Sequence, residues 1–422
     1  MSNKAKTTKV AGASSSKAGQ LGEQDAPTTV PKLRFPEFRD AVGWKERPLG
    51  DFLSESRLPG SKGNVAKKIT VKLWGNGVFE KNDAIQGSIN TQYFRRKSGQ
   101  FIYSKLDFLN QAFGIIPPSL DNFESTVDLP CFDFAEGLNS IFLLEYVKRR
   151  DFYERLGETA DGSRKARRIH AETFLSFPIA LPSQPEQQKI AECLSSVDEL
   201  MAAQARKLDA LKTHKKGLMQ QLFPREGETQ PRLRFPEFQN APAWEVKPLG
   251  RVAENLDNRR VPITSSDRRA GEVPYYGASG IVDYVEGFIF DEDLLCVSED
   301  GANLVARNYP IAFPISGKTW VNNHAHVLRF ENACTQKFVE VYLNSIKLDD
   351  FITGMAQPKL NKAMLDRIPI PHPRVPEQQL IADCLSSLDT LITAETQKLK
   401  ALKTHKKGLM QRLFPSPEAV EA

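Results

Sequence analysis

The stretch PEQQKIAECLSSVDELMAAQARKLDALKTHKKGLMQQLFP at residues 185–224 has a second copy, PEQQLIADCLSSLDTLITAETQKLKALKTHKKGLMQRLFP, at residues 376–415. From Ala210 onward the two copies differ at one position only, where Gln221 stands against Arg412. Sequences this similar fold into the same structural unit, so the repeat predicts the architecture before any local pattern does.

Each copy is predicted to form one long helix. Apolar residues recur at alternating steps of four and three from Ile190 to Leu222, and again from Ile381 to Leu413. This average spacing of about 3.5 residues is typical of a coiled-coil seam. A Pro in the first turn and a Pro after the last turn limit each helix. We therefore expect the two helices to pair antiparallel about a pseudo-twofold axis. The alternative is two ordinary amphipathic helices, each packed on its own domain.

Polar residues interrupt both apolar ladders at matched positions. They are Gln204 and Lys215 in the first helix, and Glu395 and Lys406 in the second. For an antiparallel pair, this pattern leads to the hypothesis that Lys215 faces Glu395 while Gln204 faces Lys406.

A second repeat begins each half of the chain. It reads PKLRFPEFRDAVGWKERPLG at residues 31–50 and PRLRFPEFQNAPAWEVKPLG at residues 231–250. The chain is therefore expected to be two half-molecules, each with a constant frame (the entry segment and the long helix) around a middle. The two middles share little sequence, so the frame is constant and the middle is variable.

The middles contain short β-type runs that are interrupted by Gly, Asn and Pro. Strands are expected at Ile69–Leu73, Gln100–Tyr103, Ser140–Leu144, Pro274–Tyr276, Gly287–Phe290, Leu294–Ser298 and Ala325–Phe330. A short helix is expected at Lys337–Leu348, and extended runs at Phe177–Pro182 and Ile368–Pro373 lead into the long helices.

The predicted fold class is α+β, with two domains separated by two long helices that form an antiparallel coiled-coil spacer. The expected segments are a disordered basic arm at 1–30, a first domain with its entry segment at 31–182, the first spacer helix at 183–224, a linker at 225–230, a second domain with its entry segment at 231–373, the second spacer helix at 374–415 and a tail at 416–422.

Composition excludes several classes of protein. The net charge of +5, from 57 basic and 52 acidic residues, permits a polyanionic partner without requiring one. Five widely spaced cysteines, an odd number, suggest a reducing compartment. No apolar run approaches the roughly 18 residues of a membrane span and the start has no apolar signal core, so we expect a cytoplasmic protein.

The candidate catalytic and metal-binding motifs in the sequence are incomplete. Ser316–Thr319 ends like a phosphate-binding loop, but the motif's first Gly would fall at Ala312 and Pro314 intrudes. His324 and His326 have no accompanying Cys/His cluster, so loop histidines that bond to their neighbours are preferred over a metal site. We therefore predict no catalytic residue, no metal and no cofactor bound by this chain.

Both middles instead combine cations with planar amides and aromatic rings, the side chains that bind phosphates and base edges. The alternative for any one cluster is a solvated charged face. In the first domain the candidate DNA-binding residues are Lys67, Lys68, Asn90, Gln92, Tyr93, Arg95, Arg96, Lys97, Arg164, Lys165, Arg167 and Arg168. In the second they are Tyr275, Tyr276, Ser279, Asn303, Arg307, Lys318, Asn322, Asn323, His324, Gln357 and Lys359, with the loops Gly277–Gly280, Ser298–Asn303 and Asn322–His326 favoured for contact.

A Gly-led basic loop precedes the closing strand in both halves. Its sequence is GSRKARR at 162–168 and GMAQPK at 354–359. Matched placement in divergent domains favours a shared phosphate anchor. A charged hairpin tip is the alternative.

Taken together, these motifs resemble the specificity (S) subunits of type I restriction–modification systems. The resemblance covers residues 31–415 and is carried by Leu-Arg-Phe-Pro-Glu-Phe with a later Trp and Pro-Leu-Gly, by Gly-Met-Ala-Gln-Pro-Lys-Leu before Ile-Pro-Ile-Pro, and by Pro-Glu-Gln-Gln-x-Ile-Ala-x-Cys-Leu in both halves. The first half departs from this pattern, because it has Arg164–Arg168 where the second has Gln357-Pro358-Lys359.

The resemblance implies two target recognition domains, each reading one half of an asymmetric, interrupted sequence in double-stranded DNA. It implies a non-catalytic subunit that assembles with two methyltransferase subunits, which use S-adenosylmethionine, and with restriction subunits that use ATP and Mg. The competing class is a coiled-coil scaffold whose variable domains bind a partner other than DNA. A fused methyltransferase–specificity enzyme is disfavoured, because the sequence contains no S-adenosylmethionine fingerprint.

Overall fold

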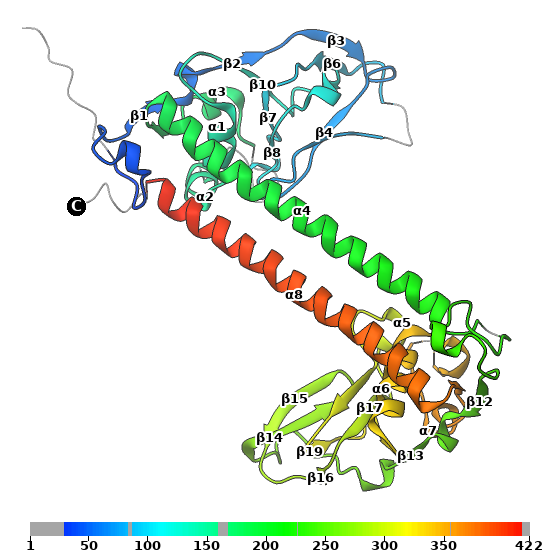
Figure 1. Cartoon of the computed structure of the whole chain (residues 1–422). Coiled ribbons are helices and arrows are strands. Elements are labelled where there is room, and N and C mark those ends of the chain that lie inside the picture. Colours follow the sequence, from blue (N-terminus) through cyan, green and yellow to red (C-terminus); the bar gives the residue numbers. More distant parts are fainter. Residues whose placement is uncertain (1–28, 83–86, 159–167, 226, 355, 416–422) are drawn as a thin grey trace, which may run out of the picture. The chain divides into compact units, whose positions relative to one another are not determined.

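The computed structural model describes residues 29–82, 87–158, 168–225, 227–354 and 356–415. The predicted tail at 416–422 and residues 1–28 of the predicted arm at 1–30 lie outside these residues, while Thr29, at the end of that arm, forms a β-bridge with Trp44. The chain forms two compact units, one made of residues 1–200 with 402–422 and the other of residues 201–401. Each unit contains one β-rich domain and parts of both long helices (Figure 1).

The two predicted long helices are confirmed as α4 (Gln184–Leu222) and α8 (Val375–Leu413), each of 39 residues. They pack together within each unit, as expected. In the first unit, Ile190 and Leu413 share one core, and in the second Leu222 and Ile381 share another. Each helix start also packs on its own domain. Among the described residues, no helix combines the length and apolar character that crossing a membrane requires.

The predicted register of the helices is wrong. In the second unit, the Gln204 side-chain amide donates to the Glu395 backbone carbonyl at 3.1 Å, and Lys215 pairs with Asp389 at 2.6 Å. In the first unit, Lys406 pairs with Asp198 at 2.7 Å. Lys215 thus finds its carboxylate six positions from the predicted one (389 against 395). The prediction failed because it considered only the polar breaks in the ladder and omitted the acids beside it.

Both units share a sheet framework despite their different sequences. A two-stranded antiparallel sheet joins the entry segment to the closing strand, β1 (Lys45–Pro48) with β11 (Pro178–Leu181) and β12 (Glu245–Pro248) with β21 (Pro369–His372). Each unit also has a four-stranded sheet. In the first unit its strand order is β2 (Leu53–Ser56), β10 (Cys131–Phe134), β7 (Phe101–Tyr103), β8 (Phe113–Ile115). In the second unit the order is β13 (Ala253–Asn255), β20 (Ala325–Phe330), β17 (Leu294–Ser298), β18 (Ala312–Ile315).

The units differ in the elements added to this framework. The first adds the sheet β3 (Pro59–Lys62), β6 (Gln92–Arg95), β9 (Glu124–Ser125), the hairpin β4 (Ile69–Val71) and β5 (Val78–Glu80), and helices α1 (Ser140–Val147), α2 (Arg150–Gly157) and α3 (Ala171–Leu175). The second adds the sheet β15 (Gly280–Val285), β14 (Ala270–Gly277), β19 (Lys318–Val321), β16 (Phe290–Asp291), and helices α5 (Asn303–Ala306), α6 (Ala333–Ser345) and α7 (Lys362–Leu365).

Most predicted strands fall on observed ones, but Ser140–Leu144 is helical. The Asn139 side chain accepts hydrogen bonds from the backbone N–H groups of Ile141 and Phe142, both at 3.0 Å, and so caps the start of α1. The apolar run Ile141–Leu144 is too short for its periodicity to separate a strand from a buried helix. Gly287–Phe290 is mostly loop, because β16 begins at Phe290.

A repeated ionic clamp ties each entry segment to a long helix. The Arg34 guanidinium donates two hydrogen bonds of 2.7 Å to the Glu186 carboxylate, and the Trp44 indole N–H donates to it at 3.4 Å. In the second unit, Arg234 donates to Glu377 at 2.8 and 2.6 Å. Both glutamates are almost fully buried. The two sequence repeats therefore meet at the same contact in each unit.

Candidate nucleic-acid interface

The three loops favoured in the second domain lie together. The Ser298 hydroxyl donates to the Ala278 carbonyl at 2.5 Å, which joins the 298–303 loop to the 277–280 turn. The backbone N–H of Glu299 donates to the His324 carbonyl at 2.9 Å, and the His324 ring lies 2.8 Å from the Asp300 carboxylate. Residues distant in sequence thus form one loop surface at the ends of β14, β17 and β19.

The loop that carries Lys359, residues 356–360, joins the same surface. The Gly301 N–H donates to the Pro358 carbonyl at 3.1 Å, and the Leu360 N–H donates to the Glu299 carbonyl at 2.7 Å. The Lys359 ammonium lies 3.2 Å from the Glu299 carboxylate and remains about half exposed. We call these four loops together the recognition surface of the second domain.

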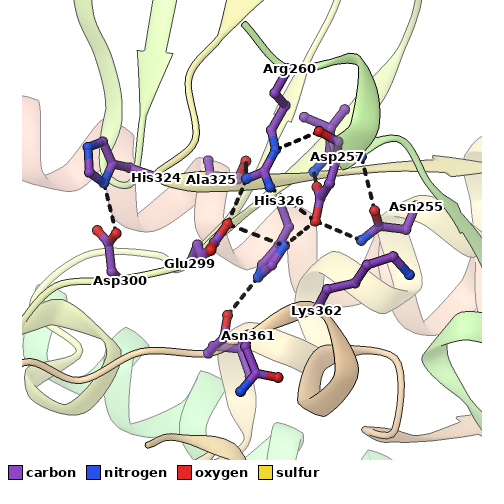
Figure 2. Close-up of polar contacts among 12 residues, drawn as sticks. Asn255, Asp257, Arg260, Glu299, Asp300, His324, Ala325, His326, Asn361 and Lys362 are labelled. Atoms are coloured by element: carbon purple, nitrogen blue, oxygen red, sulfur yellow. Dashed lines mark hydrogen bonds and ion pairs between the residues drawn. The ribbon is translucent and has the colours of Figure 1, made fainter. Parts of the chain in front are cut away.

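A buried cluster of charges lies beneath this surface (Figure 2). Arg260 donates to the Glu299 carboxylate at 2.7 Å and to the Ala325 carbonyl at 2.8 Å. The His326 ring, which is fully buried, lies with Nδ1 2.6 Å from Asp257 Oδ2 and Nε2 2.7 Å from the Leu360 carbonyl oxygen. The cluster joins a turn at Asp257–Arg259, strand β20 and the end of the Lys359 loop.

Both acids of the cluster remain charged. Burial would raise the pKa of Asp257, but its hydrogen bond and charge interaction with His326, the Val327 N–H and the Arg260 charge together hold that pKa below its usual value. The pKa of Glu299 is lowered for similar reasons, since Arg260, His326 and Lys359 together outweigh burial. The cluster is thus a network of matched charges.

Three members of the cluster could in principle bind a cation. Their potential ligand atoms, from Asp257, Glu299 and His326, lie within 4.8 Å of one another. The Arg260 guanidinium, however, already contacts both carboxylates, at 2.7 and 3.4 Å, and the Leu360 carbonyl occupies the other ring nitrogen. A second cation would repel Arg260, so we assign the group as an ion-pair cluster.

Several predicted residues of the second domain present exposed side chains. Tyr276 is half-buried, and its ring stacks on Phe313 with centroids 6.0 Å apart. The Ser279 hydroxyl donates to the Tyr309 hydroxyl at 3.0 Å, and Lys318 covers the Phe288 ring at 4.9 Å. The exposed candidates are Ser279, Lys318, Asn323, His324, Gln357 and Lys359.

Four other predicted residues of this domain have structural partners. Tyr275 is fully buried, and its hydroxyl accepts from the Ile263 N–H at 3.0 Å. Arg307 donates to carbonyls at the end of α6 at 3.2 and 2.9 Å, and burial lowers its pKa. The buried amides of Asn303 and Asn322 bond to loop backbone. These four side chains thus have structural partners in the loops, and their assignment as DNA contacts stays a prediction.

The first domain shows the same division. Arg96 is 2% exposed and donates to the Ser56 carbonyl at 2.7 Å and the Ser125 hydroxyl at 2.8 Å. Burial lowers its pKa. Lys68 is also buried, 6.0 Å above the half-buried Tyr93 ring, and Gln92 donates to the Gly60 carbonyl at 2.9 Å. Arg96 thus has structural partners within the domain, and its assignment as a DNA contact stays a prediction.

Other cations of the first domain remain accessible. Lys97 donates to the Asn122 side chain at 2.8 Å, and Arg168 lies 3.4 Å from the Asp128 carboxylate with about half of its side chain exposed. The exposed candidates are Lys67, Asn90, Arg95, Lys97 and Arg168. Arg164, Lys165 and Arg167 lie outside the described residues, so the shared phosphate anchor stays a prediction.

The acids were the residues that sequence reasoning missed. Asp257, Glu299 and Asp300 organise the recognition surface, yet none was singled out, because a search for phosphate-binding chemistry passes over carboxylates. One usable signal was present, because Glu299 and Asp300 lie inside the favoured loop Ser298–Asn303.

Comparisons with known proteins place the fold. The S subunit of a type I restriction–modification system from M. genitalium matches with a TM-score of 0.59 at 16% identity, over 92% of this chain and 99% of that one. A structure reported for complex assembly and conformational transition of the type I system matches with a TM-score of 0.53 at 15% identity, over 92% of this chain and all of that one. The chain thus shares their fold, two β-rich domains with two long helices that pack together.

Sequence comparison gives the family. The chain belongs to the type I restriction modification DNA specificity domain family, whose model matches residues 145–213 and 242–404, more than half of the chain. A type I restriction enzyme specificity subunit from Haemophilus influenzae is 40% identical over 151 residues, 36% of this chain and 38% of that protein. The MjaX specificity subunit of Methanocaldococcus jannaschii is 24% identical over 288 residues, 65% of this chain and 66% of that protein. These alignments span less than two thirds of each relative.

Proposed function

We propose that this chain is the DNA specificity subunit of a type I restriction–modification complex and carries out no catalysis itself. The observation that supports this most directly is the contrast between a repeated framework and two unlike exposed loop sets. A repeated framework suits two copies of one partner subunit, while unlike loops suit unlike base sequences. We further propose that the protein acts in the cytoplasm.

Each domain would read one half of a split target in double-stranded DNA. In the second domain, Lys359 and Lys318 would bind phosphates, while Asn323, His324 and Gln357 offer groups for base edges. In the first domain, Arg95, Lys97 and Arg168 would bind phosphates. Because the two loop sets differ, the target should be asymmetric. The helix pair would fix the length of the unread gap between the half-sites.

The repeated framework would bind two methyltransferase subunits. Identical residues of the two repeats are exposed in both units, among them Glu37 with Glu237 and Lys212 with Lys403. Two equivalent surfaces suit two copies of one partner. S-adenosylmethionine would be bound by those subunits, and ATP and Mg by restriction subunits.

Co-expression with a methyltransferase subunit of a type I system from the same genome tests the proposal. Adenine methylation mapped across the host DNA should reveal one interrupted motif. Exchanging residues 45–182 for another first domain should alter one half of that motif and leave the other half unchanged. A stable complex without any methylation or DNA affinity would favour the scaffold alternative.

Phosphate contacts are tested by the salt dependence of DNA binding to the complex. Lys359→Ala and Arg95→Ala should each weaken binding to all sequences and reduce the slope of log affinity against log salt by about 0.9. Lys347→Ala, which removes an exposed cation beyond α6, is the control and should leave the slope unchanged. An unchanged slope for Lys359→Ala would remove that residue from the contact set.

A further inference from the structure

We propose that His326 is a positioning residue, held as an imidazolium beneath the recognition surface, whose two N–H groups fix the Asp257 turn and the Lys359 loop in one arrangement. The inference deepens the proposed function and rests on it, because it takes the Lys359 loop to be a DNA contact. His326 itself would touch no DNA, since its side chain is buried.

The charge state follows from the partners of the ring. Nε2 lies 2.7 Å from the Leu360 carbonyl oxygen, which can only accept a hydrogen bond, so Nε2 must carry a proton. Nδ1 lies 2.6 Å from Asp257 Oδ2. A proton on Nδ1 as well makes the ring an imidazolium, whereas a proton on Asp257 would make it neutral.

The surroundings of Asp257 decide between these two states. Its Oδ1 accepts from the Val327 backbone N–H at 2.9 Å, and its Oδ2 accepts from the Asn255 side-chain amide at 3.1 Å. Arg260 lies 3.4 Å from Oδ2. Donors thus face both oxygens and the Arg260 charge lies beside them, which stabilises the ionised carboxylate relative to the protonated one. Asp257 is therefore the ionised partner, and His326 carries both protons.

The other charges facing the ring support the same assignment. Glu299 Oε2 lies 3.8 Å from His326 Nδ1 and 2.7 Å from Arg260. Two carboxylates are thus shared by two buried cations, with Lys359 at the exposed edge of Glu299. The adjacent pair of Asp300 and His324 lies nearer the surface. The Glu299 carboxylate beside Nδ1 favours a positive charge on the ring.

The same two bonds give His326 its positioning role. The residue sits on β20, which is paired on both sides, with β13 and β17, and is therefore a rigid base. Its Nε2–H bond ends at the Leu360 carbonyl, one residue from Lys359. Without that bond, Leu360 keeps its backbone N–H contact to Glu299 but loses its anchor to β20. The Lys359 loop would then sample positions that no longer match a phosphate.

Nuclear magnetic resonance of the full chain, labelled with 15N-histidine, tests the charge state directly. At about pH 7 the His326 ring should show protons on both of its nitrogens. That signal should disappear in His326→Gln. A His326 ring with a bare Nδ1 would overturn the proposal, whatever the protein does to DNA.

DNA binding by the assembled complex tests the positioning role. His326→Gln, which cannot donate at both places, should weaken binding to the cognate target about tenfold and lower the salt slope as Lys359→Ala does. The double variant should be no weaker than Lys359→Ala alone, because both changes remove the same contact. Additive losses would mean that His326 supports the domain generally and would overturn the role. His170→Gln, an exposed histidine of the first unit, is the control.

The outcomes separate this inference from the proposed function. If the wild-type complex binds no DNA, the proposed function fails, while the resonance experiment still decides the charge state. If the wild type binds and His326→Gln binds equally well with an unchanged salt slope, the proposed function stands and the positioning role fails.

Discussion

Replacing Glu186 by Gln should destabilise the first unit and leave the second unaffected. Glu186 is 1% exposed, and its carboxylate accepts two hydrogen bonds from Arg34 and one from Trp44. Glutamine has nearly the same shape but keeps only one acceptor oxygen, and its NH2 group would face donors. The variant therefore tests the charge of the clamp rather than its packing.

The magnitude follows from the burial of the pair. Breaking a buried ion pair by removing one partner costs about 3–5 kcal/mol. Arg34 retains hydrogen bonds to the carbonyls of Ala41 and Val42 at 2.7 and 3.0 Å, so we expect the lower end, about 3 kcal/mol. For a unit of this size, each kcal/mol shifts the melting temperature by about 2–4 °C. The expected fall is therefore about 6–12 °C.

Thermal unfolding combined with hydrogen exchange on the full chain assigns the loss to a unit. Glu377→Gln is the matched replicate and should destabilise the second unit by a similar amount, because Arg234 and Trp244 reproduce the clamp. Glu37→Gln removes an exposed partner of Lys189 and should change nothing measurable. If Glu186→Gln behaves like Glu37→Gln, the clamp carries no stability and the reasoning is wrong.

Three further predictions concern other charges. Lys406→Met should lower the free energy of unfolding of the first unit by about 2 kcal/mol, because Lys406 pairs with the buried Glu145 as well as with Asp198. Lys215→Met, which removes only the pair with Asp389, should lower the free energy of unfolding by about 0.5 kcal/mol. Equal losses in denaturant titrations would contradict this. The pKa values of Asp257 and Glu299 are lowered from their ordinary values of 3.8 and 4.5, so the stability that these ionised groups contribute is complete above about pH 4.5 and is lost as the pH falls further. Hydrogen exchange of the β20 amides should therefore accelerate below that pH. Arg96→Lys should lower the free energy of unfolding by about 2 kcal/mol, because Lys cannot reach all the hydrogen-bond partners of Arg96. The salt slope of DNA binding should stay unchanged, and a lower slope would show that Arg96 contacts DNA.

The sequence was sufficient to predict the framework. Long, strictly periodic helices and duplicated entry segments carry the same signal many times, so α4 and α8 were located within a residue or two. The register required more, because it depends on which acids the lysines reach, and Asp198 and Asp389 lie off the apolar ladder. Periodicity identifies the face of a helix but not its axial position.

The candidate interface was predicted only in outline. The loops at 277–280, 298–303 and 322–326 were favoured for DNA contact, and they do lie together. Individual side chains were less predictable. Arg96 and Arg307 donate hydrogen bonds to backbone carbonyls inside the domain, yet in the sequence they cannot be distinguished from an arginine that binds a phosphate. Burial is decided by tertiary packing, which local sequence does not encode.

The shared core of the first unit also has a consequence for biosynthesis. Phe414, just beyond the end of α8, packs against Trp44 and Phe142 with ring centroids 6.1 and 5.3 Å away, so this core remains incomplete until the ribosome has translated that far. The second unit is one uninterrupted segment, residues 201–401. The second unit should therefore complete its folding before the first unit does, although most of it is synthesised later. Until then the nascent first domain exposes apolar surface, so we expect chaperones to bind it during synthesis.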